Sequence, residues 1–190
     1  MKSSTWQGTA VFFDRDGTLI RDKGYLSDPD GIDILPGAIE AVRSLNNAGI
    51  KVIIVTNQSG IARGYFSEVT LHAIHDRLMA LFAGQGAGID AVYYCPHHPE
   101  GIVDAYRKTC SCRKPEPGLL LKAAEEFGLD LKRCYLVGDK PIDDIETIHR
   151  VGGKGILIST DDETGVKSNT DYITHDICDA VHWICGDMAG

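Results

Sequence analysis

The sequence T-A-V-F-F-D-R-D-G-T occupies residues 9–18 and joins a short apolar run to two closely spaced carboxylates. Residues 9–13 predict a buried β-strand, because the run is short and mostly apolar. Asp14 and Asp16 follow where the strand gives way to a turn, and Gly17 supplies the backbone freedom that such a turn needs. Two acids are therefore expected at the carboxyl end of a buried strand.

Polar residues also follow other predicted strands. Residues 51–56, K-V-I-I-V-T, form a β-branched run that predicts a second buried strand and ends at Thr56. Residues 134–137 predict another strand, which leads into Gly138-Asp139. Ligands of open α/β sheets bind beyond the carboxyl ends of the strands. A ligand site is therefore expected where these polar residues meet.

Strand-like and helical segments alternate along the sequence. Further strands are expected at residues 89–94 and 155–159, and helices at residues 36–47, 67–83, 119–127, 142–151 and 176–185. This alternation predicts a parallel sheet with helices on both faces. We therefore expect an α/β fold with a doubly wound parallel sheet, forming a single domain over residues 1–190. The connections are too short for a large cap domain, so the site should be open.

Composition and charge exclude several classes of protein. Apolar residues make up 43% of the 190 residues and charged residues 24%, which is typical of a globular protein. The sequence contains no apolar run long enough for a membrane span, and its N-terminus lacks the pattern of a signal peptide, so a cytoplasmic location is expected. The net charge of −8 disfavours binding to nucleic acid or to an anionic membrane.

The polar residues at the strand ends suit phosphoryl transfer. One carboxylate of the Asp14–Asp16 pair can attack phosphorus while the other protonates the leaving oxygen. A divalent cation is needed to offset the repulsion between carboxylates and phosphate, and oxygen ligands favour Mg²⁺, with Asp139 as a further ligand. Thr56 can donate hydrogen bonds to phosphate oxygens, and Lys114 can supply a fixed positive charge.

The order of these motifs resembles the haloacid dehalogenase-like superfamily: D-x-D-G-T at residues 14–18, a strand-ending Thr56, Lys114, and G-D-x-x-x-D at residues 138–143. Within it, four segments resemble the D-glycero-D-manno-heptose 1,7-bisphosphate 7-phosphatase family. They are F-D-R-D-G-T at 13–18, V-T-N-Q-S-G-I-A-R-G at 55–64, Y-C-P-H-H-P at 94–99 and C-R-K-P at 112–115. The resemblance spans roughly residues 10 to 160.

The resemblance implies an enzyme that removes the C7 phosphate of the heptose bisphosphate, leaving heptose 1-phosphate for ADP- or GDP-heptose and lipopolysaccharide precursors. Asp14 would be the nucleophile and Asp16 the general acid and later base. The expected Mg²⁺ ligands are the Asp14 carboxylate, the Asp16 carbonyl and Asp139, with Asp143 outside the direct ligands. Thr56 and Lys114 would stabilise the phosphoryl group, and Arg113 would recognise substrate. Further substrate contacts are expected from Asp22, Lys23, Gly24, Tyr25, Asn57, Gln58, Ser59, Arg63 and Lys140. We expect a monomer that binds a small phosphorylated sugar.

A second metal site is predicted by the sequence between residues 95 and 112. Cys95, His97, Cys110 and Cys112 supply three thiolates and one imidazole, which suits a tetrahedral structural Zn²⁺ with no open position. His98 competes with His97 for this role, and the family motif favours His97. Zinc would hold the long loop so that the adjacent Arg113 and Lys114 face the substrate. The other three cysteines, in apolar surroundings, are expected to be inert core residues.

Two other functions share some of these features. Histidinol-phosphate phosphatases have the same aspartate pair and a similar zinc loop, but their loop is typically shorter than the one that holds residues 99–106 here. A non-catalytic zinc-bearing interaction module would need a basic, aromatic-rich surface. Near the loop the sequence offers only Arg107, Lys108, Arg113 and Lys114, against an acidic total.

Overall fold

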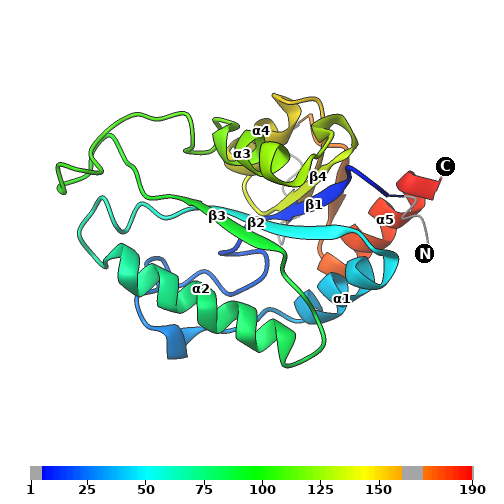
Figure 1. Cartoon of the computed structure of the whole chain (residues 1–190), viewed down its shortest axis with the longest axis horizontal. Coiled ribbons are helices and arrows are strands. Elements are labelled where there is room, and N and C mark those ends of the chain that lie inside the picture. Colours follow the sequence, from blue (N-terminus) through cyan, green and yellow to red (C-terminus); the bar gives the residue numbers. More distant parts are fainter. Residues whose placement is uncertain (1–5, 160–168, 190) are drawn as a thin grey trace.

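The computed structural model of the protein describes residues 6–159 and 169–189. The ends of the expected 1–190 domain, residues 1–5 and 190, lie outside these ranges, as do residues 160–168. The described part contains a six-stranded parallel sheet of order β3-β2-β1-β4-β5-β6 (Figure 1). The strands are β1 (Ala10–Phe13), β2 (Lys51–Asn57), β3 (Ala91–Cys95), β4 (Tyr135–Gly138), β5 (Lys154–Ile158) and β6 (Tyr172–Thr174).

The register of the central strands brings the carboxyl ends of three of them together. Phe13, the last residue of β1, lies opposite Ile54 of β2 and Val137 of β4. The residues that follow these three positions therefore lie side by side at the carboxyl end of the sheet. Asp14, Thr56 and Asp139 come together for this reason.

Helices cover both faces of the sheet (Figure 1). One face carries α1 (Ala38–Ala48), α2 (Glu68–Ala83) and α5 (Ile177–Ala189), and the other carries α3 (Gly118–Phe127) and α4 (Glu146–His149). Short 3₁₀ turns lie at Pro29–Gly31 and Leu131–Arg133. None of the helices in the described ranges has the length and apolar content needed to cross a bilayer.

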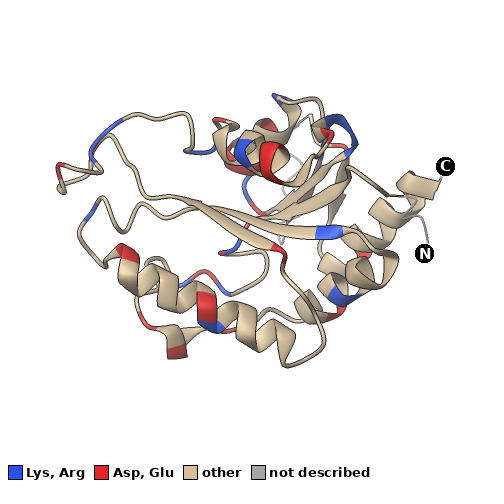
Figure 2. Ribbon diagram, in the orientation of Figure 1, with Lys and Arg blue, Asp and Glu red and all other residues tan. Residues whose placement is uncertain are grey.

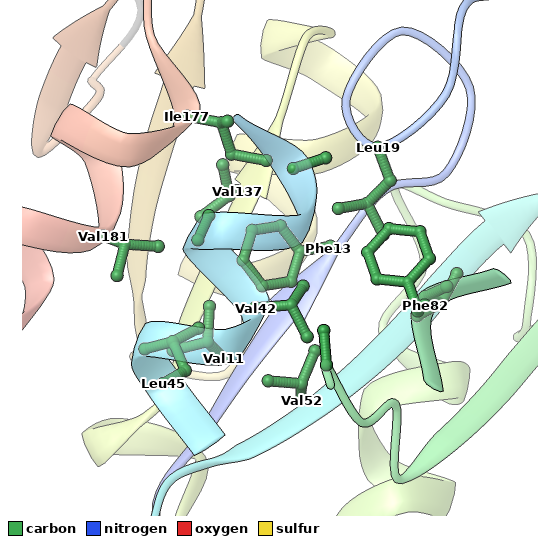
Figure 3. Close-up of a cluster of buried hydrophobic side chains, with 14 of the residues drawn as sticks. Val11, Phe13, Leu19, Val42, Leu45, Val52, Phe82, Val137, Ile177 and Val181 are labelled. Atoms are coloured by element: carbon green, nitrogen blue, oxygen red, sulfur yellow. The ribbon is translucent and has the colours of Figure 1, made fainter. Parts of the chain in front are cut away.

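The central strand explains why both faces need helices. Val11 and Phe13 pack with α1, α2 and α5, whereas Ala10 and Phe12 pack with α3 and α4, and all four side chains are fully buried. Figure 3 shows the first of these cores, with Phe13 close to Val42 and Val137. Burying one such Phe side chain contributes about 1.5–3 kcal/mol. The doubly wound α/β fold predicted from the sequence is confirmed.

Two elements differ from the sequence prediction. β6 was not predicted, because a three-residue edge strand has too little apolar pattern to stand out. The helix expected over residues 142–151 begins as a π-helical turn at Pro141–Ile145 and becomes α-helical only at Glu146–His149. π-helical turns occur frequently at functional sites, and this one begins two residues after Asp139.

Candidate active site

The side chain of Lys114 is buried at the carboxyl end of the sheet. It reaches there from the loop before α3, and its Nζ donates hydrogen bonds to Asp14 Oδ1 at 2.8 Å, to the Val55 carbonyl at 3.0 Å and to Asp144 Oδ1 at 2.5 Å. Burial lowers the pKa of Lys114, but the attraction of Asp14 and Asp144 outweighs burial and raises it overall. Lys114 is therefore a permanent cation beside Asp14.

The backbone of Lys114 is fixed as firmly as its side chain. Asn57 Nδ2 donates to the Lys114 carbonyl at 3.1 Å, and the Lys114 amide donates to Asn57 Oδ1 at 3.0 Å. This reciprocal pair joins the end of β2 to the loop before α3. It sets the position of the ammonium group relative to the strand ends.

Asp144 is a site residue that the sequence did not reveal. The G-D-x-x-x-D pattern pointed to Asp143, but Asp144 is the fully buried acid that contacts Lys114, and its Oδ2 also accepts from the Lys140 amide at 3.0 Å. Burial raises the pKa of Asp144 to about 7, against the opposite effect of Lys114. Asp143 lies in the wall of the cavity described below, and its place outside the direct metal ligands stays a prediction.

Three carboxylates form a cluster that needs a cation. Oxygens of Asp14, Asp139 and Asp144 lie within 4.8 Å of one another. Asp139 Oδ1 is buried and accepts no hydrogen bond; the closest cation is Lys140 Nζ, at 3.5 Å. Burial raises the pKa of Asp139, because no neighbouring charge offsets its desolvation fully. Mg²⁺ prefers oxygen ligands, and this cluster offers carboxylate oxygens, one of which has no hydrogen-bond partner. The cluster therefore suits Mg²⁺.

Gly17 is required beside this cluster for two reasons. Its φ angle of +88° lies in the left-handed region, where residues with a side chain are rarely found. A Cβ atom at this position would also lie 2.2 Å from Asp139 Oδ2. The glycine of the D-x-D-G-T motif therefore leaves room for the carboxylate that follows β4.

The carboxylate of Asp16 accepts hydrogen bonds from two buried side chains, those of Arg15 and Gln58. Arg15 donates to both of its carboxylate oxygens, and Gln58 Nε2 donates to Asp16 Oδ2 at 2.9 Å and to Thr56 Oγ1 at 2.8 Å. The amide of Gln58 is therefore engaged within the site. Thr56 is buried too, and its hydroxyl group shares the Gln58 amide with Asp16.

A cavity of about 290 Å³ opens beyond Asp14 and Asp16. Its wall includes most of the residues expected to contact substrate: Asp22, Gly24, Tyr25, Thr56, Asn57, Gln58, Ser59, Arg113, Lys114 and Lys140. Two expected residues do not line it. Lys23 Nζ donates to the Gly31 carbonyl at 2.7 Å, and Arg63 contacts His98. A substrate role for Lys23 and Arg63 stays a prediction.

The four predicted metal ligands of the second site lie together. Single ligand atoms of Cys95, His97, Cys110 and Cys112 are within 4.8 Å of one another, and the three sulfur atoms are 3.2–3.5 Å apart with no disulfide. His98 lies outside the group, since its ring contacts the Glu100 amide and Arg63. The structure thus favours His97 over His98 as the imidazole of this possible metal site.

The loop that carries this cluster borders the active site. It runs from β3 to α3 without a helix or strand, and Figure 2 shows several Lys and Arg along it. Arg113 Nη1 donates to the His97 carbonyl at 3.4 Å, which ties the cavity-lining arginine to the cluster. Of the other cysteines, Cys134 is buried, and Cys178 and Cys185 are half-buried against the core.

Comparison with known proteins agrees with this geometry. Residues 11–72 match the family model "Haloacid dehalogenase-like hydrolase" and residues 111–181 match the HAD-hydrolase-like model. The chain is 42% identical over 191 residues to the D-glycero-D-manno-heptose-1,7-bisphosphate 7-phosphatase of Thermosynechococcus vestitus, covering 95% of this chain and 97% of the relative. It is 37% identical over 180 residues to the D-glycero-beta-D-manno-heptose-1,7-bisphosphate 7-phosphatase of Escherichia coli K12, covering 95% and 90%.

A solved structure is similar as well. The D,D-heptose 1,7-bisphosphate phosphatase of B. bronchiseptica, crystallised with magnesium and phosphate, superimposes with a TM-score of 0.80. It is 31% identical, and the match covers 94% of this chain and 99% of that chain. The chain therefore belongs to the D-glycero-D-manno-heptose-1,7-bisphosphate 7-phosphatase family of haloacid dehalogenase-like hydrolases and is a phosphatase.

Proposed function

We propose that the enzyme hydrolyses the C7 phosphate of D-glycero-D-manno-heptose 1,7-bisphosphate to heptose 1-phosphate through an aspartyl-phosphate on Asp14. The observation that carries this proposal is the position of the Asp14 carboxylate, which lines the cavity and is hydrogen-bonded to a buried lysine. The names of the relatives support the choice of substrate. The product would serve ADP- or GDP-heptose precursor synthesis.

The reaction divides into two steps. In the first, an Asp14 carboxylate oxygen attacks phosphorus, the bond from phosphorus to the C7 oxygen breaks, and Asp16 gives that oxygen a proton. In the second, Asp16 takes a proton from a water molecule that attacks phosphorus, which releases inorganic phosphate and restores Asp14. Lys114 and Thr56 stabilise the negative charge of the transferred group.

The carboxylates of Asp14 and Asp139, with the Asp16 carbonyl, would hold Mg²⁺. The bound ion supplies charge neutralisation between carboxylate and phosphate and polarises the phosphoryl oxygens. The acidic cluster described above supports this choice, as does the magnesium bound in the B. bronchiseptica relative. Each of the three ligands comes from a strand end, so the ion would be held by rigid elements.

The second phosphate of the substrate needs its own cation. Arg113 and Lys140 line the cavity, whereas Lys114 is fully engaged with Asp14, Asp144 and the Val55 carbonyl. A guanidinium fork can bind phosphate oxygens in pairs, which a lysine cannot do. We therefore assign Arg113 to the sugar or its distant phosphate. The net charge of −8 disfavours nucleic acid and anionic membranes as partners. A cytoplasmic location and a monomeric state are further parts of this proposal.

A comparison of substrates tests this assignment. Purified enzyme with Mg²⁺ is assayed on both anomers of the heptose bisphosphate and on histidinol phosphate, and the position of the remaining phosphate is read by ³¹P NMR. We expect kcat/KM to be higher for the heptose bisphosphate by about ten-fold or more, the loss expected when a charged group goes unpaired. A higher kcat/KM for histidinol phosphate would refute the substrate while leaving the aspartyl-phosphate chemistry intact.

We also propose that Cys95, His97, Cys110 and Cys112 bind a structural Zn²⁺. Three sulfurs and one imidazole nitrogen within one small group support this choice, because this ligand set closes a tetrahedral site. The metal would hold the loop that carries Arg113 and Lys114.

Elemental analysis checks the zinc proposal. We expect about one zinc per chain in freshly purified protein, retained under mild chelation that removes Mg²⁺. Cys112→Ser should lose the zinc and lower both the melting temperature and activity, whereas Cys185→Ser, outside the cluster, should retain the metal. Wild-type protein purified without zinc would refute the site.

A further inference from the structure

A buried arginine and a buried histidine lie directly behind Asp16. Arg15 is 1% exposed, and His75, on α2, is 5% exposed. Arg15 Nε donates to Asp16 Oδ2 at 3.1 Å, Nη2 donates to Asp16 Oδ1 at 3.0 Å, and Nη1 lies 3.1 Å from His75 Nε2. Asp16 and His75 are thus connected through one guanidinium group.

The contact between Arg15 and His75 fixes the state of the histidine. A guanidinium group can only donate hydrogen bonds, so His75 Nε2 must accept, and the proton of the neutral ring lies on Nδ1. Burial and the charges of Arg15 and His72 lower the pKa of His75 to about 3, which agrees with a neutral ring. His75 therefore acts as a hydrogen-bond acceptor rather than as a cation.

The carboxylate of Asp16 is restrained unevenly. Oδ2 accepts from Arg15 Nε and from Gln58 Nε2, and Arg15 Nη2 lies 2.9 Å from it as well. Oδ1 has Arg15 Nη2, at 3.0 Å, as its one donor among these groups. Asp16 also lines the active-site cavity. Oδ1 therefore keeps a lone pair for a proton, at an orientation set by the guanidinium plane.

We propose that Arg15 and His75 are positioning residues for Asp16: His75 orients the guanidinium group, which in turn orients the carboxyl oxygen that transfers the proton. Helix α2, which carries His75, thereby supports the acid–base step. This role rests on the proposed chemistry of Asp16. It requires no change in the charge of His75.

The test compares leaving groups, since a general acid matters most when the departing oxygen is basic. His75→Leu removes the acceptor, and His75→Gln restores one through its amide oxygen. We expect His75→Leu to lower kcat/KM about ten-fold for the heptose bisphosphate, in the range found for residues that orient ligands at active sites. For p-nitrophenyl phosphate the loss should be less than about two-fold. His75→Gln should recover most of the difference.

Two controls separate positioning from stability and from the proposed function. His72 lies on the same helix but forms no hydrogen bond with Arg15. His72→Leu should therefore leave the ratio of kcat/KM for the two substrates unchanged. Asp16→Asn gives the ratio of kcat/KM for the two substrates when the general acid itself is removed. Equal losses on both substrates in His75→Leu, or no recovery in His75→Gln, would overturn the positioning role. If Asp16→Asn showed no preference between leaving groups, the proposed role of Asp16 itself would be wrong.

Discussion

Asp14→Asn is expected to lower kcat by about four orders of magnitude or more, the scale seen when a covalent nucleophile is removed. The substitution keeps the shape of the side chain, but an amide oxygen is a poor nucleophile toward phosphorus. It also removes one ligand oxygen of the proposed Mg²⁺ site. Initial rates on p-nitrophenyl phosphate and on the heptose bisphosphate measure the loss.

A matched variant shows whether the loss is specific. Asp33→Asn removes the charge of an exposed carboxylate that pairs with Arg21. Neither residue lines the cavity. Its activity should remain within about two-fold of wild type, because exposed pairs contribute little. If Asp14→Asn kept near-normal turnover, a covalent route through this carboxylate would be excluded.

Lys114→Met is expected to reduce both stability and activity strongly. It leaves the buried carboxylates of Asp14 and Asp144 without their shared cation, and breaking a buried ion pair by removing one partner costs about 3–5 kcal/mol. Activity should fall by about three orders of magnitude, because a fixed positive charge at the phosphoryl group is lost. Urea unfolding without Mg²⁺ and steady-state kinetics measure the two effects.

The double variant Lys114→Met/Asp144→Asn separates these effects. Removing the charge of Asp144 relieves part of the repulsion, and its amide oxygen can still accept from the Lys140 backbone. Part of the lost stability should return, whereas activity should not. Unchanged stability in Lys114→Met, or recovered activity in the double variant, would contradict the role given to this lysine.

The sequence predicts the sheet and the polar residues at its strand ends because both depend on local pattern. Short apolar runs identify buried strands, and the polar residue that follows each run must lie at the carboxyl edge. Asp14, Asp16, Thr56, Lys114 and Asp139 were found in this way or from the family motifs. The grouping of Cys95, His97, Cys110 and Cys112 was also predicted, since cysteine and histidine spacing is visible in the sequence.

The features of the site that the sequence did not predict depend on contacts between residues far apart in the chain. The pair Asp143-Asp144 offers two acids, and only the π-helical turn decides which of them is buried against Lys114. Arg15 and His75 are 60 positions apart, and their contact requires α2 to be docked on the sheet. The choice between His97 and His98 likewise depends on the path of the loop.

The most direct test of the covalent mechanism is capture of the phosphoenzyme. Wild-type and Asp16→Asn enzymes are mixed with Mg²⁺ and p-nitrophenyl phosphate, quenched in acid within the first turnover, digested and analysed by tandem mass spectrometry. We predict one phosphoryl group on Asp14, with more of it in Asp16→Asn because the base for its hydrolysis is missing. Release of p-nitrophenol with no phosphoryl group on Asp14, or with the group on another residue, would contradict the account.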